Sequence, residues 1–320
     1  MRILITGITG FVGGHLVRLL LQQGAQEVVG FARDKEWSGE AGDVAARVAL
    51  YPLDLCDRPA TQALLTSVRP DQIYHLAGYA DTGSSFREPE AAWEGNLTAT
   101  RALYEAVLGW GGRPRILYIG SGSVYGEPTD VHRPIDEETV LRPNNPYAAS
   151  KAAADLASYQ VFRTHGLEII RTRPFNHVGP GQSPRFAVPN FARQIAAIDR
   201  GQAPPVLRVG NLDSERDLTD VRDVVRAYQL LIDRGQPGEV YNVASGQSLP
   251  VRIHLEKLLS LGKVTVKVEA DPTLVRRVDT TAVRVNIHRL QATTGWSPRF
   301  SLDQTLADTL GYWRRMLAGA

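Results

Sequence analysis

Tyr147 and Lys151 are the residues whose types and spacing most clearly point to chemistry. They lie four positions apart in the segment NPYAASK, where a helix is expected, so both side chains project from the same helix face. A phenol has a pKa of about 10, but a nearby ammonium favours the phenolate and makes the proton available to a carbonyl oxygen. The pair fits a proton donor in carbonyl reduction, and an ordinary pair on a surface helix is the alternative.

Ser121 is a candidate third member of this group. It follows a run typical of a strand in the segment YIGSGSVYG, where its hydroxyl could hydrogen-bond the reacting carbonyl. A local serine turn is the alternative role. The chain contains only five lysines, so the position of Lys151 one helical turn after Tyr147 favours the catalytic interpretation of all three residues.

Three glycines, Gly7, Gly10 and Gly13, follow the first apolar run at intervals of three in ILITGITGFVGGHL. The segment predicts a strand, a glycine-rich turn and a helix that begins near Phe11. Such a turn lets backbone N–H groups approach a pyrophosphate, and the helix N-terminus favours the anionic group. The spacing is typical of the short-chain type of Rossmann domain, and a structural strand-to-helix corner is the alternative.

The ends of the next two predicted strands indicate which dinucleotide is bound. Arg33 in GFARDK lies where a 2′-phosphate would be, whereas the adjacent Asp34 could bind the 2′-hydroxyl of NAD(H). Asp54 in PLDL is placed to reach the adenine amine, with a turn or a helix cap as its alternative role. We therefore predict NADP(H) as the cofactor and keep NAD(H) as the alternative.

The composition argues against several other classes of protein. The formal net charge is +2, which gives no electrostatic reason to expect a nucleic acid or a membrane as partner. Cys56 is the only cysteine and the seven histidines are scattered, so we expect neither a disulfide nor a metal site. The first apolar run is too short for a signal peptide, and no run approaches the roughly 20 residues of a membrane span. The expectation is a soluble cytoplasmic protein.

Short β-branched runs alternate with helical patterns in the first half of the chain. The predicted strands cover residues 2–6, 27–31, 48–53, 72–77, 115–120 and 167–173. This alternation implies an α/β fold with a doubly wound parallel sheet, a Rossmann domain over residues 1–173. Proline and glycine become frequent after residue 174, so residues 174–320 are expected to form mainly a smaller C-terminal substrate-binding lobe, with a later return of the chain to the first domain.

Motifs along nearly the whole chain resemble those of the extended short-chain dehydrogenase/reductase family of nucleotide-sugar enzymes. They are TGITGFVGGHL, DLCD, HLAG, GSGSVYG, PYAASK, RPFNHVGPGQ, RDLTDVRDVVRAY, VYNVASGQ and TGWSP. Within this family, FNHVGPGQSPRF, GNLDSERDLTDVRD and LVRRVDTTAVRV are most similar to the branch that reduces GDP-linked 4-keto-6-deoxy hexoses. The related GDP-mannose 4,6-dehydratases share much of the same pattern.

The resemblance implies roles for individual residues. Catalysis is assigned to Ser121, Tyr147 and Lys151. The implied cofactor ligands are Gly7, Gly10, Phe11, Val12, Gly13, Arg33, Asp54, Leu55, Leu76, Ala77, Tyr147, Lys151, Pro174 and His177. The implied contacts of a GDP-sugar substrate are Ser85, Ser123, Asn176, Arg216, Arg276 and Asp279. Alternative roles remain for several of these: Ser85 could cap a helix, Arg277 could replace Arg276, and His177 could be structural.

Ser123 bears on which reaction the resemblance implies. In the dehydratase relatives an acidic residue stands at this position and performs acid–base work during the loss of water. A serine hydroxyl is a poor base at neutral pH, which disfavours dehydration. The implied reaction is therefore NADPH-dependent reduction of a C4 ketone on a GDP-linked sugar. A reductase or 4-epimerase for another nucleotide sugar, a GDP-mannose 4,6-dehydratase and a non-catalytic NADP-sensing regulator are the alternatives.

The resemblance also implies a homodimer. Relatives pair through the helix after the fourth strand and the helix that carries Tyr147 and Lys151, which together form a four-helix contact.

Overall fold

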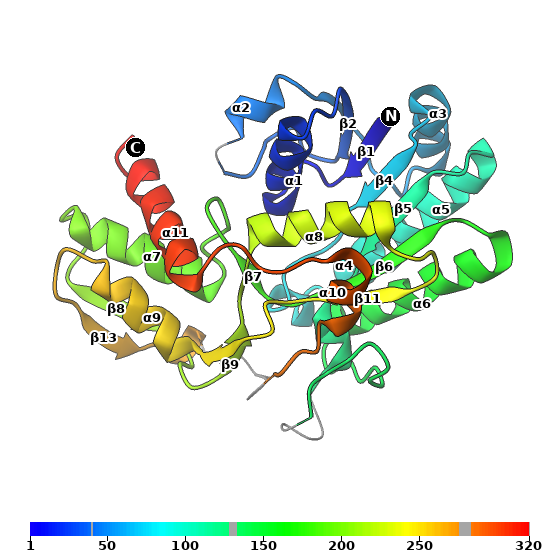
Figure 1. Cartoon of the computed structure of the whole chain (residues 1–320). Coiled ribbons are helices and arrows are strands. Elements are labelled where there is room, and N and C mark those ends of the chain that lie inside the picture. The colour runs from blue at the N-terminus through cyan, green and yellow to red at the C-terminus, as the bar shows by residue number, and fades with distance from the viewer. Residues whose placement is uncertain (40, 128–132, 275–282, 320) are drawn as a thin grey trace.

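A computed structural model describes residues 1–39, 41–127, 133–274 and 283–319 (Figure 1). Within these ranges seven strands form one parallel sheet in the order β11-β6-β5-β4-β1-β2-β3. The strands are β1 (Arg2–Thr6), β2 (Glu27–Ala32), β3 (Ala49–Pro52), β4 (Gln72–His75), β5 (Arg115–Ile119), β6 (Ile169–Pro174) and β11 (Val240–Val243). The first six match the strands predicted from the sequence to within three residues at each end, and the doubly wound parallel sheet confirms the predicted fold class.

Helices cover both faces of this sheet, and its central strands are therefore buried on both sides, which fits their nearly continuous apolar sequences. One face packs against α1 (Phe11–Gln22), α8 (Val221–Arg234) and α10 (His288–Thr294), whose apolar residues join one core cluster. The other face packs against α3 (Arg58–Val68), α5 (Ala99–Trp110) and α6 (Pro146–His165). The short helices α2 (Gly42–Ala45) and α4 (Pro89–Trp93) lie in the connections.

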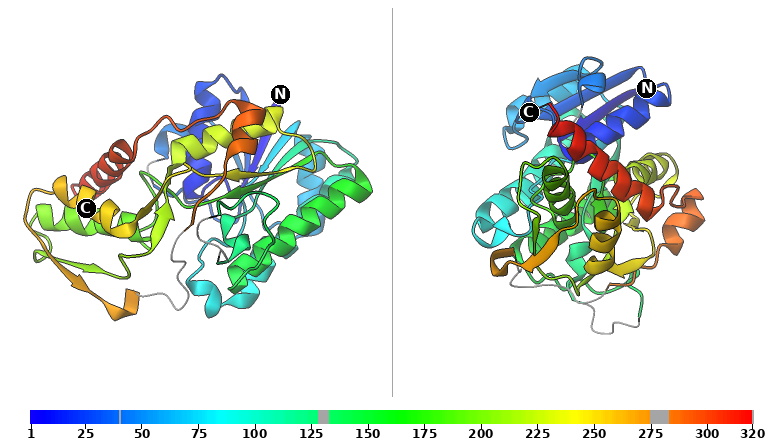
Figure 2. Two further views of the ribbon diagram at one scale, coloured as in Figure 1. Left: turned by 60° about the horizontal axis from the view of Figure 1, so that its bottom comes forward. Right: turned by 90° about the vertical axis from the view of Figure 1, so that its left-hand side faces the viewer.

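A second, smaller group of elements has its own hydrophobic core. It contains α7 (Ala187–Asp199), α9 (Val251–Ser260) and α11 (Leu302–Met316), which pack together with β8 (Val206–Val209). β8 pairs in parallel with β13 (Lys267–Ala270). This group lies to one side of the large sheet in Figure 1 and in the left view of Figure 2.

The chain passes between the two groups more than once. After β6 it enters the region of β7 (His177–Val178), which pairs with β10 (Thr219–Asp220) directly before α8. α8 and β11 then belong to the large sheet, whereas β12 (Ser248–Pro250) pairs with β9 (Glu215–Asp217) and leads into α9. No helix of the described part of the chain is both long and apolar enough to cross a membrane.

The predicted turn between β1 and α1 requires glycine at two of its positions. Gly7 has a φ of 68°, in the left-handed region, and a Cβ there would lie 2.8 Å from the backbone of Ala77. A Cβ on Gly13 would lie 2.1 Å from the carbonyl oxygen of Ile8. The turn therefore holds the start of α1 close against β1 and against the loop after β4.

We predict that Gly13→Ala destabilises the protein by about 2 kcal/mol or more, because the new methyl group must displace the Ile8 carbonyl. Gly14→Ala is the matched control, since a Cβ there meets only Ala41 Cβ at 3.9 Å. This change should be neutral or should stabilise the helix by up to about 1 kcal/mol. Urea unfolding of both variants measures the difference, and equal stabilities would contradict the account of Gly13.

Candidate active site

A cavity of about 1080 Å³ lies at the carboxyl ends of the parallel strands. The strand order reverses between β4 and β1, and such a switch point is the usual ligand site of a doubly wound sheet. All of the residues predicted to bind the cofactor line this cavity: Gly7, Gly10, Phe11, Val12, Gly13, Arg33, Asp54, Leu55, Leu76, Ala77, Tyr147, Lys151, Pro174 and His177. The cavity continues to residues of α7 and β9, so both groups of elements form its wall.

Ser121, Tyr147 and Lys151 meet at one wall of the cavity. Ser121 follows β5 by two residues, and its Oγ accepts a hydrogen bond from the N–H of Ser123 at 3.1 Å. Tyr147 and Lys151 lie in the first turns of α6, which begins at Pro146 after the cap residue Asn145. The side chains of Tyr147 and Ser121 lie close enough for the Ser121 hydroxyl to affect the pKa of the Tyr147 phenol. The structure thus brings the three predicted catalytic residues together.

The pKa shifts of Tyr147 and Lys151 differ from the expectation that a nearby ammonium favours the phenolate. Burial raises the pKa of the Tyr147 phenol, and the hydrogen bond with Ser121 opposes this effect. Burial lowers the pKa of Lys151 to about 8. Its Nζ donates a hydrogen bond to the carbonyl oxygen of Ile119 at 3.0 Å. Desolvation, rather than the ammonium of Lys151, therefore determines the direction of the Tyr147 shift, so Tyr147 is a neutral phenol that still carries its proton at pH 7.

A buried hydrogen-bond chain supports the lysine side of the site. His75 at the end of β4 bonds Thr6 Oγ1 at 2.8 Å and Thr100 Oγ1 at 2.9 Å. Burial lowers the pKa of His75 to about 3, so the ring is neutral. The Asn96 side chain donates to Ser150 Oγ at 2.9 Å, and Ser150 is adjacent to Lys151 in α6. These contacts tie α6 to the ends of β1 and β4.

A second set of buried hydrogen bonds connects α6 to residues 121–125, called the serine loop below. The Asp155 carboxylate, fully buried on α6, accepts hydrogen bonds from Arg171 at 2.6 Å and from Arg173 at 2.9 Å. Arg173 also donates to the Tyr125 hydroxyl at 2.9 Å, and Tyr125 donates to Asn242 Oδ1 at 2.8 Å. Tyr125 ends the short helical turn that begins just after Ser121. None of these residues was among the predicted site residues, although Tyr125 lies in the GSGSVYG motif and Asn242 in VYNVASGQ.

The opposite end of the cavity contains the residues predicted to bind the adenosine. Arg33 follows β2, is exposed and lines the cavity together with Ser38, which the sequence analysis did not identify. Asp54 Oδ1 accepts a hydrogen bond from the N–H of Cys56 at 2.9 Å, so this side chain also forms the local turn that was its alternative role. Both roles are compatible, because Asp54 remains exposed at the cavity wall.

His177 lies between the two ends of the cavity. Its ring stacks on Phe11 with centroids 6.1 Å apart, and its Nδ1 bonds the carbonyl oxygen of Phe175 at 3.2 Å. Burial lowers the pKa of His177. The residue is therefore a neutral, hydrogen-bonded histidine in the cavity wall.

The residues predicted to bind the sugar nucleotide divide into three sets. Ser123, Asn176 and Arg216 line the cavity. Ser85 does not: it is fully buried in the turn 84–86, and its hydroxyl donates to the carbonyl oxygen of Thr82 at 2.7 Å. The prediction for Ser85 therefore requires correction, because this helical turn points its side chain inward and leaves Thr82 at the cavity wall. Arg276 and Asp279 lie outside the described residues.

Further polar residues of the smaller group line the cavity and were not predicted. They are Arg185, Asn190, Asn211 and Ser214. Arg185 also lies 3.7 Å from the carboxylate of Asp81, which belongs to the loop after β4. The motifs FNHVGPGQSPRF and GNLDSERDLTDVRD contain three of these four residues. The sequence signal was therefore present, but the motifs alone did not show which side chains face the cavity.

This chain is similar to known proteins along nearly its whole length. The family model described as GDP-mannose 4,6 dehydratase matches residues 4–309. The chain belongs to this family. It is 37% identical, over 98% of its length and 97% of the relative's, to the GDP-6-deoxy-D-mannose reductase of Pseudomonas aeruginosa. The family membership confirms the resemblance found in the sequence motifs.

Solved structures of family relatives agree with the fold and differ in their chemistry. The Pseudomonas aeruginosa protein RMD, solved in complex with NADPH, has a TM-score of 0.85 and 34% identity, with 99% of this chain and 100% of that chain covered. The UDP-glucose 4-epimerase of Thermus thermophilus, solved with NAD, has a TM-score of 0.87 and 28% identity, with coverage of 98% and 99%. Because the family includes reductases, epimerases and dehydratases, the residues of the site must decide between these activities.

We predict that Lys151→Met alters the pH dependence of stability. In the wild type, Lys151 has a pKa of about 8 when folded and about 10.5 when unfolded, so the wild type gains stability as the pH rises from 8 to 10.5. The methionine variant lacks this gain. The difference in free energy of unfolding between variant and wild type should therefore change by roughly 3 kcal/mol over this range, in favour of the wild type. Denaturant titrations at pH 7, 9 and 10.5 measure it, and a pH-independent difference would contradict the buried ammonium.

Proposed function

We propose that this protein reduces the C4 ketone of a GDP-linked 4-keto-6-deoxy hexose with NADPH, converting GDP-4-keto-6-deoxy-D-mannose to GDP-D-rhamnose. The observation that carries the proposal is that Ser121, Tyr147 and Lys151 line one cavity of a chain that is similar over its whole length to a reductase. The protein is thus proposed to be an oxidoreductase that acts on a nucleotide sugar.

The cavity fits a dinucleotide on structural grounds. The Gly7 and Gly13 positions have no room for a side chain, so the backbone at the start of α1 can approach a pyrophosphate closely. Arg33, which follows β2 at the cavity wall, supplies a cation for a 2′-phosphate, which favours NADPH over NADH. Bound there, NADPH supplies the hydride for the reduction.

The chain's own residues handle the carbonyl and the proton. The Ser121 hydroxyl orients the ketone by donating a hydrogen bond to its oxygen, and Tyr147 then gives its proton to the same oxygen as negative charge develops there. The raised pKa of Tyr147 keeps this proton available at neutral pH. Lys151, still mostly protonated at pH 7 with a pKa of about 8, is placed to hold the ribose hydroxyls beside the phenol.

The substrate diphosphate would bind on the side of the smaller group. Arg216 and Asn176 supply cationic and amide donors at the cavity wall, and Arg185 adds a second guanidinium. Arg276 and Asp279 are proposed as further contacts of the diphosphate and of the nucleotide ribose. In this arrangement residues 1–173, together with the returning elements α8 and β11, supply most of the dinucleotide contacts, and the remainder supplies most of the sugar-nucleotide contacts.

Ser123 favours reduction over dehydration. Loss of water from C5 and C6 needs a base for the C5 proton and an acid for the departing hydroxyl. The cavity presents the neutral hydroxyl of Ser123 where dehydratase relatives use an acid. A 4-epimerase would need a tightly held NAD, whereas the arginine at position 33 favours the exchangeable NADPH of a net reduction.

We also propose that the protein is a cytoplasmic homodimer. Three large apolar side chains remain exposed on the adjacent helices α4 and α6, namely Trp93, Leu156 and Tyr159, with 39%, 58% and 42% of their surface accessible. A second copy that covered this face would form a four-helix contact directly behind Tyr147 and Lys151.

We predict that the protein oxidises NADPH only when GDP-4-keto-6-deoxy-D-mannose is present, with NADH giving a lower kcat/KM. Absorbance at 340 nm follows the reaction. Tyr147→Phe should lower kcat by about 10²–10⁴-fold, because the proton donor is removed. The affinity of this variant for NADPH should stay within a few fold of the wild type, which separates chemistry from binding.

Two results would overturn the proposal. One is a wild type that binds NADPH but consumes none with the keto sugar. The other is conversion of GDP-mannose to the 4-keto-6-deoxy sugar without added reductant, which identifies a dehydratase. Turnover only with keto sugars carried on dTDP, UDP or CDP would replace GDP by that nucleotide.

We predict that Leu156→Arg converts a dimer to a monomer, because a charge in the centre of an apolar contact is costly to desolvate. Light scattering measures the mass of the wild type and the variant. Arg163→Ala at the exposed end of the same helix is the control and should remain dimeric. A monomeric wild type would contradict this part of the proposal.

A further inference from the structure

Asn144 is an exposed residue of the cavity wall, three positions before Tyr147 in the segment that leads into α6. The helix does not need Asn144 as its cap, because the neighbouring Asn145 has that role. Asn145 Oδ1 accepts a hydrogen bond from the N–H of Ala148 at 2.8 Å. The capping of α6 therefore does not explain a second amide side chain at the cavity wall.

Hydrogen bonds determine which end of the Asn144 amide remains free. The Ala148 N–H can only donate, so the atom of Asn145 that faces it is the carbonyl oxygen Oδ1, and the other end of the Asn145 amide is the donor Nδ2. This Nδ2 donates to Asn144 Oδ1 at 3.0 Å. The Nδ2 of Asn144 is left with no hydrogen-bond partner in the described ranges, and it offers two N–H donors.

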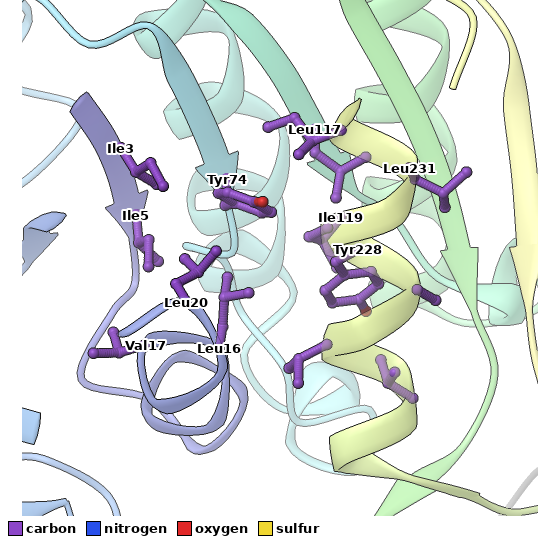
Figure 3. Close-up of a cluster of buried hydrophobic side chains, with 14 of the residues drawn as sticks. Ile3, Ile5, Leu16, Val17, Leu20, Tyr74, Leu117, Ile119, Tyr228 and Leu231 are labelled. Carbon is purple, nitrogen blue, oxygen red and sulfur yellow. The ribbon is translucent and has the colours of Figure 1, made fainter. Parts of the chain in front are cut away.

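The position of Asn144 along the chain places it on the far side of Tyr147 from Lys151. Lys151 lies one turn after Tyr147, and its Nζ donates a hydrogen bond to the carbonyl oxygen of Ile119, the last residue of β5 (Figure 3). Asn144 lies in the opposite direction, before the start of α6. Side chains on a helix lean towards its N-terminus, so the Tyr147 phenol leans towards the segment of Asn144.

The segment of Asn144 packs against the serine loop. The N–H of Arg142 donates a hydrogen bond to the carbonyl oxygen of Val124 at 3.1 Å. A Cβ on Gly126, which follows the serine loop, would lie 1.9 Å from the carbonyl oxygen of Arg142, so the two backbones are in direct contact. Ser123 of this loop lines the cavity together with Asn144. Asn144 therefore belongs to the part of the wall proposed to bind the sugar.

We propose that the Asn144 side chain donates a hydrogen bond to the C3 hydroxyl of the keto sugar and thereby selects sugars with an oxygen next to the reacting carbon. The inference rests on the proposed function, because it requires Ser121 and Tyr147 to hold the C4 ketone. The two ring carbons that flank C4 differ in what they offer an N–H donor. C3 carries a hydroxyl, whereas C5 carries a methyl group and the ring oxygen, which is a weak acceptor.

The experiment compares Asn144→Ala with the wild type on two substrates. One is GDP-4-keto-6-deoxy-D-mannose, and the other is GDP-4-keto-3,6-dideoxy-D-mannose, which lacks only the C3 hydroxyl. Absorbance at 340 nm with NADPH gives kcat and KM. On the 3-hydroxy sugar we expect the kcat/KM of the variant to fall about 5–10-fold, mainly through KM, because one neutral hydrogen bond is lost. On the 3-deoxy sugar the variant and the wild type should be equal, as should their affinities for NADPH.

Arg142→Ala is the matched control. Arg142 is exposed in the same segment and is not among the residues that line the cavity, and its backbone contact with Val124 does not depend on its side chain. This variant should keep the kcat/KM of the wild type on both sugars. Equal losses in Arg142→Ala and Asn144→Ala would indicate a general disturbance of the segment before α6 and would overturn the inference.

Two other results would also overturn it. Unchanged kcat/KM of Asn144→Ala on the 3-hydroxy sugar would mean that the amide makes no contact with the substrate. Equal losses on both sugars would mean that it contacts a group other than the C3 hydroxyl. A wild type that reduces neither sugar rejects the proposed function. Isothermal titration with GDP-mannose and GDP-3-deoxymannose then decides the role of Asn144, and the inference stands only if Asn144→Ala weakens the binding of GDP-mannose alone.

Discussion

The geometry of the site depends on the buried ion pairs of the Asp155 carboxylate with Arg171 and Arg173. This carboxylate is fully buried between the two arginines, so it fixes α6 against β6 in one register. Removing one partner of such a buried group typically costs 3–5 kcal/mol, because it leaves a charge without compensation. Arg173 extends the connection to Tyr125 in the serine loop. The buried Asp155 carboxylate therefore links the helix that carries Tyr147 to the turn that follows Ser121, and so fixes the position of one relative to the other.

The sequence predicted those features of the fold and of the site that depend on a short, local pattern of residues. The β-branched runs gave the first six strands, and the glycine spacing gave the turn before α1, because each signal is confined to a short segment. The residues proposed for catalysis could be singled out for the same reason, since Tyr147 and Lys151 are one helical turn apart. Family membership supports this interpretation, and the proposed substrate follows from it together with the cavity residues.

The remaining features depend on contacts between distant segments. Ser85 points inward because of its place in a tight helical turn, and the raised pKa of Tyr147 reflects burial that no local motif encodes. The Asp155 group joins α6 and β6, and through Arg173 reaches the serine loop, so no single motif reveals it.

The large sheet cannot be completed until late in translation, because α8 and β11 return to it after part of the smaller group has been synthesised. When the ribosome has produced the first six strands, α8 and β11 are still missing, so Leu16 and Ile119 lack the apolar side chains that cover them in the finished molecule. The nascent sheet cannot close this face until residues 221–243 have emerged, and the elements of α7 and β8 are made in between. The large sheet is therefore completed late, after part of the smaller group, and its apolar face stays uncovered during translation until α8 has emerged.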